Sequence, residues 1–220
     1  MKKPWIFGTL VAAIFAFQAG SAEAFVKVIP HESGDKSEII IYTPQIVDME
    51  KDFVQDRINA YFTNSVQAMF ADYQELLEPG AKASTFLSDY QVTYNDGNLI
   101  SMAQRIYMYT GGAHGNTFYI TGTFNTETGE EITLGDLFLP GKEYKEYLTA
   151  LIRDEIALRG KEEAYIFFTA VTDDTNFYLT EEGLVILYPP YGAAPYAEGT
   201  VRFLIPWWRL YDWLNVGINI

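Results

Sequence analysis

The chain has 220 residues, of which 49% are hydrophobic, and it carries a formal net charge of −14 with no cysteine. The charge argues against nucleic acids and anionic lipid surfaces as partners, because both are bound through basic patches. The lack of cysteine excludes disulfides and a lipoprotein anchor, and a chain of this length can bury a sizeable core without such cross-links.

The N-terminus predicts a secretory signal peptide over residues 1–24. Lys2 and Lys3 precede an apolar segment that is short for a membrane span, and the Ala-Glu-Ala at its end has the small-residue pattern of a cleavage site. Cleavage would remove Lys2, Lys3 and Glu23 and change the formal charge from −14 to −15. We therefore expect an exported protein, periplasmic or extracellular, with no membrane span in the mature chain. The alternative is an uncleaved N-terminal anchor.

A long amphipathic helix dominates the predicted N-terminal half, residues 25–126. From Asp48 to Leu77, apolar side chains recur at intervals of three and four residues, as on one face of an α-helix. Asp48 is the predicted N-cap, and Pro79 and Gly80 end the pattern. We expect the aromatic-rich face of this helix to pack on a sheet.

Strands are predicted on both sides of this helix. Asp96-Gly97 is a hairpin signal, because this dipeptide tolerates positive φ angles. The predicted strands are residues 25–30 and 38–45 before the helix, and 83–94, 99–110 and 116–124 after it.

The predicted C-terminal half, residues 127–220, contains a second amphipathic helix at 142–160, with Gly160 just past its end. Antiparallel strands with segregated helices indicate the α+β class. We expect an antiparallel sheet packed against one long and one shorter helix, in a compact unit whose halves meet near residue 126. The remaining predicted elements are strands at 176–180, 184–188 and 200–206 and a short helix at 207–214.

A glycine-rich corner, Gly111–Gly115, separates two of the predicted strands and contains His114, one of only two histidines. The corner is favoured as a tight, glycine-built connection. Alternatively, it borders a recognition surface, with His114 and Asn116 as ligand-binding candidates, since binding residues often lie on loops of a rigid scaffold.

No catalytic or metal site is predicted. A zinc site needs three or four histidine, cysteine or carboxylate ligands, and the chain has two histidines and no cysteine. A Gly-x-Ser-x-Gly nucleophile motif is missing as well. We therefore expect no cofactor. A pair of catalytic carboxylates, as in enzymes that cleave glycans, is defined by the distance between them, which the sequence does not show.

The loop LYPPYGAAPYAEG is the better binding candidate, and it contains Tyr188, Tyr191, Pro195 and Tyr196. Tyrosine offers a large amphipathic contact area, and prolines lower the cost of ordering a loop. The alternative is that the tyrosines pack onto the sheet. We favour that alternative for Tyr188, at a strand end, and leave it open for Tyr191 and Tyr196.

Three motifs follow one another at the spacing of a known family: YTGGAHGNT, FNTETGEEITLGDLF and NFYLTEEGLVILYPPYGAAPYAEGTVRFLIPW. Over about residues 26–212 the chain resembles the RsiV/PdaC-like extracytoplasmic domain family, in which a PdaC-like region precedes a domain of unknown function. The resemblance implies an α+β fold in the cell envelope. For RsiV it also implies a receptor-like domain that binds lysozyme, a basic protein.

We predict from this resemblance an exported binding module that recognises lysozyme or a cell-wall component such as peptidoglycan. The acidic charge suits a basic partner, or it only keeps an exported protein soluble. One alternative is an envelope enzyme acting on peptidoglycan or glycans, and another is an assembly role through exposed aromatics. The sequence shows no counterpart of the deacetylase motifs or of a sigma-binding segment, so we expect neither activity.

Overall fold

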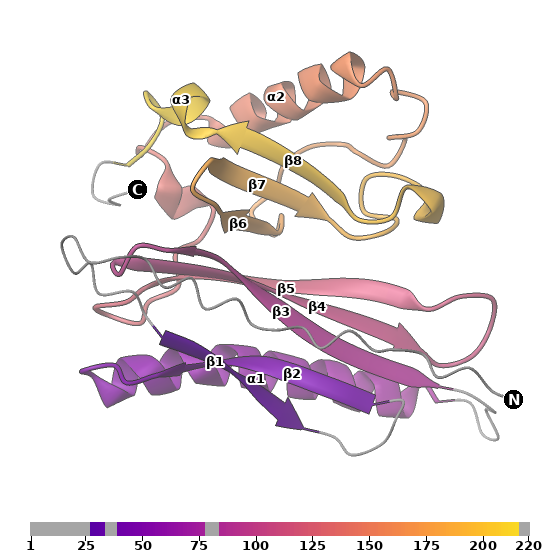
Figure 1. The fold of residues 1–220 in the computed structure, drawn as a ribbon. Coiled ribbons are helices and arrows are strands. Elements are labelled where there is room, and N and C mark those ends of the chain that lie inside the picture. The colour runs from indigo at the N-terminus through magenta and orange to yellow at the C-terminus, as the bar shows by residue number, and fades with distance from the viewer. Residues whose placement is uncertain (1–26, 34–38, 78–83, 216–220) are drawn as a thin grey trace, which may run out of the picture.

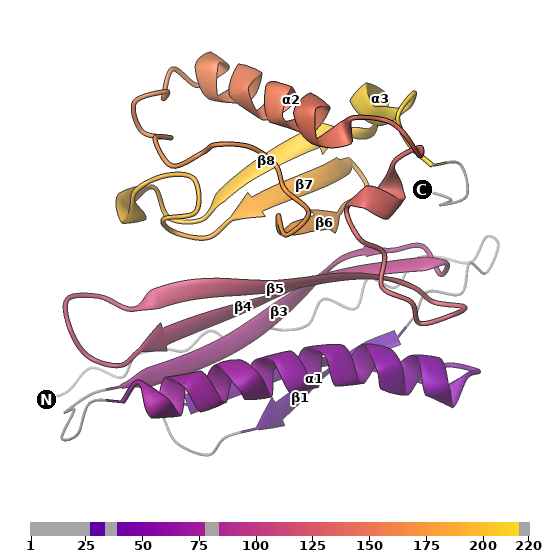
Figure 2. The same cartoon turned by 180° about the vertical axis from the view of Figure 1, so that it is seen from behind.

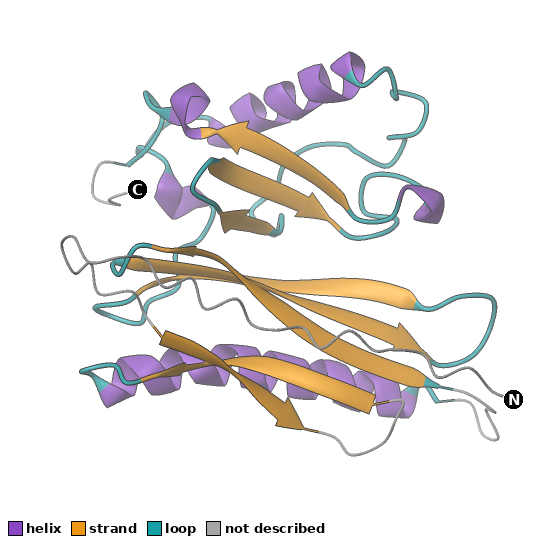
Figure 3. Cartoon of the chain, viewed as in Figure 1, coloured by secondary structure: helices purple, strands orange, loops and turns teal. Residues whose placement is uncertain are grey.

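The structure is a computed structural model and describes residues 27–33, 39–77 and 84–215. Helix α1, a five-stranded sheet, a three-stranded sheet and helix α2 lie one above the other (Figure 1). Helices cover the outer faces of the two sheets (Figure 3). The predicted α+β class, with one long and one shorter helix, is confirmed. The predicted signal peptide lies outside the described residues.

The larger sheet has the strand order β1-β2-β3-β4-β5. Its neighbours pair antiparallel, except that Ile39–Ile41 of β2 pair in parallel with Phe86–Ser88 of β3. Helix α1 connects these two strands, as expected for a parallel crossover, and the sequence did not predict this pair. The bounds are β1 Lys27–Ser33, β2 Ile39–Val47, β3 Thr85–Asn95, β4 Leu99–Tyr109 and β5 Asn116–Asn125.

Helix α1, Asp52–Glu75, packs its apolar face on this sheet. The predicted N-cap is wrong: Asp48 has a φ of 62°, and the helix begins four residues later, after Lys51. Met49 explains the error, because it packs against the same core from a non-helical segment and so continues the apolar spacing. The buried residues of α1 are Val54, Ile58, Phe62, Val66 and Tyr73.

The smaller sheet has the order β6-β7-β8 and is covered by α2 and α3 (Figures 1 and 2). Gly160 follows α2 with a φ of 60°, as predicted for the residue past the helix end. The predicted short terminal helix is helical only over its first turn. The bounds are η1 Gly135–Leu137, α2 Tyr144–Leu158, β6 Phe177–Leu179, β7 Gly183–Tyr188, η2 Tyr196–Glu198, β8 Val201–Pro206 and α3 Trp207–Leu210.

The two sheets meet through β6, which contacts β3, β4 and β5. Polar groups take part in this contact: the Ser101 and Thr123 hydroxyls lie 2.8 Å apart, and the amide of Leu179 donates to Ser101 Oγ at 3.0 Å. Strand β6 has only three residues, whereas β3, β4 and β5 have ten or eleven. The larger sheet therefore extends beyond the strand that contacts it.

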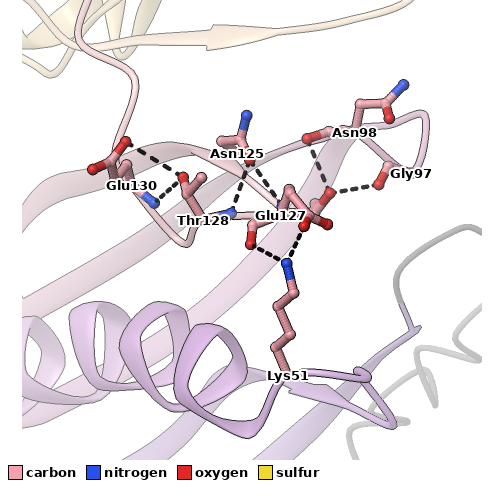
Figure 4. Close-up of polar contacts among 8 residues, drawn as sticks. Lys51, Gly97, Asn98, Asn125, Glu127, Thr128 and Glu130 are labelled. Atoms are coloured by element: carbon pink, nitrogen blue, oxygen red, sulfur yellow. Dashed lines mark hydrogen bonds and ion pairs between the residues drawn. The ribbon is translucent and has the colours of Figure 1, made fainter.

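Hydrogen bonds anchor the segment near the expected boundary between the halves (Figure 4). Asn125 Oδ1 accepts the amide of Glu127 at 2.8 Å, and Lys51 at the start of α1 forms an ion pair with the Glu127 carboxylate. The Thr126 hydroxyl donates to the carbonyl oxygen of Asn98 at 3.0 Å. This segment is thus tied to both α1 and the β3–β4 hairpin.

Candidate functional site

An aromatic cluster joins the glycine corner to the tyrosine-rich loop. His114 and Tyr196 stack with ring centroids 4.0 Å apart and planes inclined by 23°. Tyr191 lies beside both rings, with centroids 6.4 Å from His114 and 5.7 Å from Tyr196. Its hydroxyl is 3.5 Å from His114 Nε2. Three of the predicted binding candidates, from segments far apart in the sequence, are therefore brought together.

The corner that carries His114 is built by glycine, as the sequence favoured. Gly111 and Gly112 have φ angles of 123° and 93°, which other residues rarely adopt. Gly115 is required for a different reason, because a Cβ there would meet the Tyr107 ring and lie 2.7 Å from the carbonyl oxygen of Met108. His114 itself is exposed, and its Nδ1 lies 3.0 Å from the carbonyl oxygen of Gly115.

The loop between β7 and β8 is anchored by small residues and exposes a large one. Ala193 and Ala194 are buried in the core, whereas the side chain of Tyr191 is 51% exposed. Tyr191 also has a φ of 69°, in the left-handed region that costs a non-glycine residue free energy. Strained residues of this kind are concentrated at functional sites. The outlier therefore supports a binding role for this loop.

The other predicted candidates lie outside the cluster. Tyr188 packs against Phe168 and Phe203 in the core, so it is not part of an exposed surface. Burial raises the pKa of Tyr188 to about 12, and the nearby Thr175 side chain opposes the shift only in part. Asn116 is exposed at the start of β5, two residues from His114.

Pro195 is half-buried and directly precedes the 3-10 turn η2, which starts with Tyr196. Its φ of −55° fits the fixed backbone of proline and leads the chain into this turn. Pro195 therefore positions Tyr196 in the loop and takes no part in the ring contacts.

A third segment, residues 161–168, lies beside these two loops, and the sequence did not predict its role. The amide of Phe167 donates to the carbonyl oxygen of Ala193 at 3.1 Å, and Lys161 pairs with Glu198 at 2.8 Å. Ile166 and Phe167 are 63% and 44% exposed. The run Tyr-Ile-Phe-Phe after the second helix was the available signal. Three loops thus lie at one end of the molecule (Figures 1 and 2).

We call this area the tyrosine–histidine surface and define it by His114, Tyr191, Tyr196, Ile166 and Phe167. Exposed acidic residues border it: Glu162 and Glu163 lie on the 161–168 segment, and Glu198, which is paired with Lys161, lies on the loop before β8. An exposed aromatic patch with an acidic rim suits contact with a protein that carries basic groups.

The surface carries no sign of metal chemistry. Within the described ranges, no group of three histidine or acidic side chains lies close enough to hold a metal ion. The same residues include no helix that is long and apolar enough to span a membrane. The surface offers aromatic ring faces, hydroxyl groups and an imidazole, which are groups suited to binding a partner.

Two family models match consecutive parts of the chain. Residues 31–117 match the model described as deacetylase PdaC, and residues 135–208 match DUF3298, a protein family of unknown function. The resemblance predicted from the sequence is confirmed: the chain is an RsiV/PdaC-like protein with a DUF3298 region.

Relatives agree with this assignment. The chain is 23% identical to the anti-sigma-V factor RsiV of Bacillus subtilis (strain 168), over 94% of this chain and 72% of RsiV. A DUF3298 protein from Bacteroides fragilis has the same fold, with a TM-score of 0.67, 21% identity, and 88% and 94% of the two chains covered. A DUF3298 protein from Pseudomonas aeruginosa also has this fold, with a TM-score of 0.67 and 16% identity. The match covers 87% of this chain and 95% of the Pseudomonas chain.

Proposed function

We propose that this protein is an exported binding domain that recognises a basic protein partner through the tyrosine–histidine surface. A lysozyme-type muramidase is the specific candidate. The stacked pair of His114 and Tyr196 beside the exposed, strained Tyr191 is the observation that carries the proposal. Similarity to RsiV over most of the chain supports a receptor-like role in the envelope.

Aromatic side chains and charge would have separate tasks in this interaction. Tyrosine rings held in place by neighbours lose little conformational entropy on binding and commonly dominate interface energy. The net charge of −14 would steer a basic partner to the surface and raise the association rate at low ionic strength. Affinity that depends on the rings should therefore survive salt, whereas attraction by net charge alone should not.

Calorimetry with hen lysozyme tests the proposal, at low salt and at about 0.15 M, where the Debye length is about 8 Å. We expect saturable binding at both salt concentrations. Tyr196→Ala should weaken it at least ten-fold, because hot-spot residues typically contribute about 2 kcal/mol or more. Tyr211→Ala is the matched control, since Tyr211 is 81% exposed beyond α3 and outside the surface.

Two results would contradict the proposal. Binding seen only at low salt would mean that the acidic chain merely attracts a basic protein. Equal affinities of wild type, Tyr196→Ala and Tyr211→Ala would mean that lysozyme binds elsewhere on the molecule.

A further inference from the structure

A hollow with a volume of about 380 Å³ lies between the two sheets. Two arginines line it in a chain that is strongly acidic overall. Its volume falls in the range of small-molecule binding sites. We call it the arginine pocket and define it by Asp89 and Gln91 of β3, Arg105 of β4, Tyr119 of β5, Tyr178 of β6 and Arg202 of β8.

Strand register places three of these side chains in one row. Asp89 lies opposite Arg105, which in turn lies opposite Tyr119. Directly paired residues share one face of a sheet, and here it is the face toward the smaller sheet, from which Arg202 approaches. Arg202 Nη2 donates to the Tyr119 hydroxyl at 2.9 Å, and its guanidinium carbon lies 5.4 Å from the centre of the Tyr119 ring.

The charges in the pocket are unbalanced toward the positive side. Arg105 is paired with Asp89, and both side chains stay about half exposed. Arg202 forms no ion pair with a carboxylate in the part of the chain that the structure describes. The pocket thus has two guanidinium groups and one carboxylate. A planar guanidinium binds a carboxylate through two parallel hydrogen bonds, so Arg202, which has no carboxylate partner among the described residues, favours such a group.

The hollow continues into a neighbouring one of about 540 Å³, which shares Gln91, Tyr178 and Arg202 with it. Glu181 and Glu182 line that second part, together with Arg159, whose charge is paired with Glu155. A ligand that extends into it would keep its negative group at the arginine end, because the glutamates repel it from the other. Tyr178 provides a ring face and a hydroxyl for the uncharged body of the ligand, and the Tyr119 hydroxyl, which accepts from Arg202, can donate to it.

We propose that the arginine pocket binds a small organic carboxylate whose uncharged part carries hydrogen-bonding groups. An acidic sugar and a peptide with a free C-terminus both have this chemistry. The site is separate from the tyrosine–histidine surface, and its test uses other ligands, so the outcome with lysozyme does not decide it.

Titrations followed by ¹⁵N NMR on the full exported chain test the proposal with two matched pairs of probes. Glucuronate is compared with glucose, and acetyl-Ala-Ala with its C-terminal amide; the members of each pair differ in the carboxylate. We expect a carboxylate probe to shift the Nε–H signals of Arg105 and Arg202, and its neutral match to leave them in place. The carboxylate that binds more tightly, glucuronate or acetyl-Ala-Ala, shows whether the ligand is an acidic sugar or a peptide C-terminus.

Three variants should affect the affinity for the carboxylate in different ways. Arg202→Gln should weaken binding about ten-fold or more, as for loss of a charged hydrogen bond. Asp89→Asn should strengthen it, because Asp89 competes with the ligand for Arg105. Arg153→Gln removes an arginine of α2 outside the pocket and should change nothing.

Thermal unfolding checks that each variant is folded. If Arg202→Gln does not fold, the tighter binding expected of Asp89→Asn still tests the proposal. The proposal is overturned if neither carboxylate shifts the arginine signals, or if the neutral probes shift them equally. It is also overturned if Arg153→Gln weakens binding as much as Arg202→Gln does.

Discussion

The imidazole of His114 stacks on the phenol ring of Tyr196 at a centroid distance of 4.0 Å, and this contact joins the β4–β5 corner to the loop before β8. The two rings lie on loops that connect strands in two different sheets, β4 to β5 in one and β7 to β8 in the other. Their contact therefore fixes the position of one loop relative to the other. The tyrosine–histidine surface depends on this contact, so the contact should contribute to the stability of the fold.

A double-mutant cycle between these residues should reveal a favourable coupling. We expect His114→Ala and Tyr196→Ala together to destabilise the fold by less than the sum of the single changes, with a coupling of about 0.5–1.5 kcal/mol. Urea unfolding of the four proteins measures it. A second cycle between His114 and the distant Tyr211 serves as the control. Additive effects in both cycles would show that the stacking contributes nothing to stability.

Tyr191 should separate backbone strain from recognition. Because its φ is 69°, glycine at this position relieves a strain that alanine retains. We expect Tyr191→Gly to be more stable than Tyr191→Ala by about 1 kcal/mol in urea unfolding, although glycine also makes the unfolded chain more flexible. Lysozyme binding should weaken equally in both variants, since both lack the ring. Equal stabilities would mean that the loop relaxes at no cost.

Gly115 should tolerate no side chain. The added Cβ of Gly115→Ala would lie 2.7 Å from the carbonyl oxygen of Met108, and backbone in a paired strand cannot yield as a flexible side chain does. We expect a destabilisation of about 1–3 kcal/mol, as for overpacking, read from thermal or urea unfolding. Gly112→Ala is the comparison, because it meets open space and strains only the backbone. A smaller loss in Gly115→Ala than in Gly112→Ala would contradict the steric explanation.

Local signals in the sequence predicted the elements well, because they depend on neighbouring residues. The apolar spacing of residues 48–77 identified α1, and the Asp-Gly turn identified the hairpin of β3 and β4. The start of α1 was wrong because Met49 satisfies the same apolar pattern without being helical. The parallel pair of β2 and β3 was missed because a crossover pairing leaves no local signal.

The sites depend on contacts that sequence reasoning reaches only in part. The glycine corner and the tyrosine loop were both candidates, but only the packing of two sheets brings His114 to Tyr196. The arginine pocket could not be predicted from the sequence, because its strand register depends on a bulge. The hairpin turn pairs Asn95 with Ile100. Continued without interruption, this register would place Asp89 opposite Ile106, but a bulge in β3 shifts it by one residue.

Asp173 ties the segment after α2 back to the start of that helix. Its carboxylate accepts a hydrogen bond from Lys145 Nζ at 2.7 Å and another from the Tyr144 hydroxyl at 2.7 Å. These two donors, Lys145 first, lower the pKa of Asp173 below its usual value. The pKa of Tyr144 is raised to about 12, first by burial and then by Asp173, so Tyr144 remains a donor wherever the carboxylate titrates.

The contribution of Asp173 to stability should therefore disappear in acid. An aspartate titrates near pH 3.9 in an unfolded chain, and a lower folded pKa means that the stabilisation is present above this value and is lost as the pH falls through the folded one. We expect Asp173→Asn to unfold at a slightly lower temperature than wild type at pH 7, because exposed ion pairs contribute little, and at the same temperature in strong acid. Asp174→Asn controls for removing a charge from this loop. A difference between wild type and Asp173→Asn that stayed constant from pH 7 into strong acid would assign the effect to packing instead of charge.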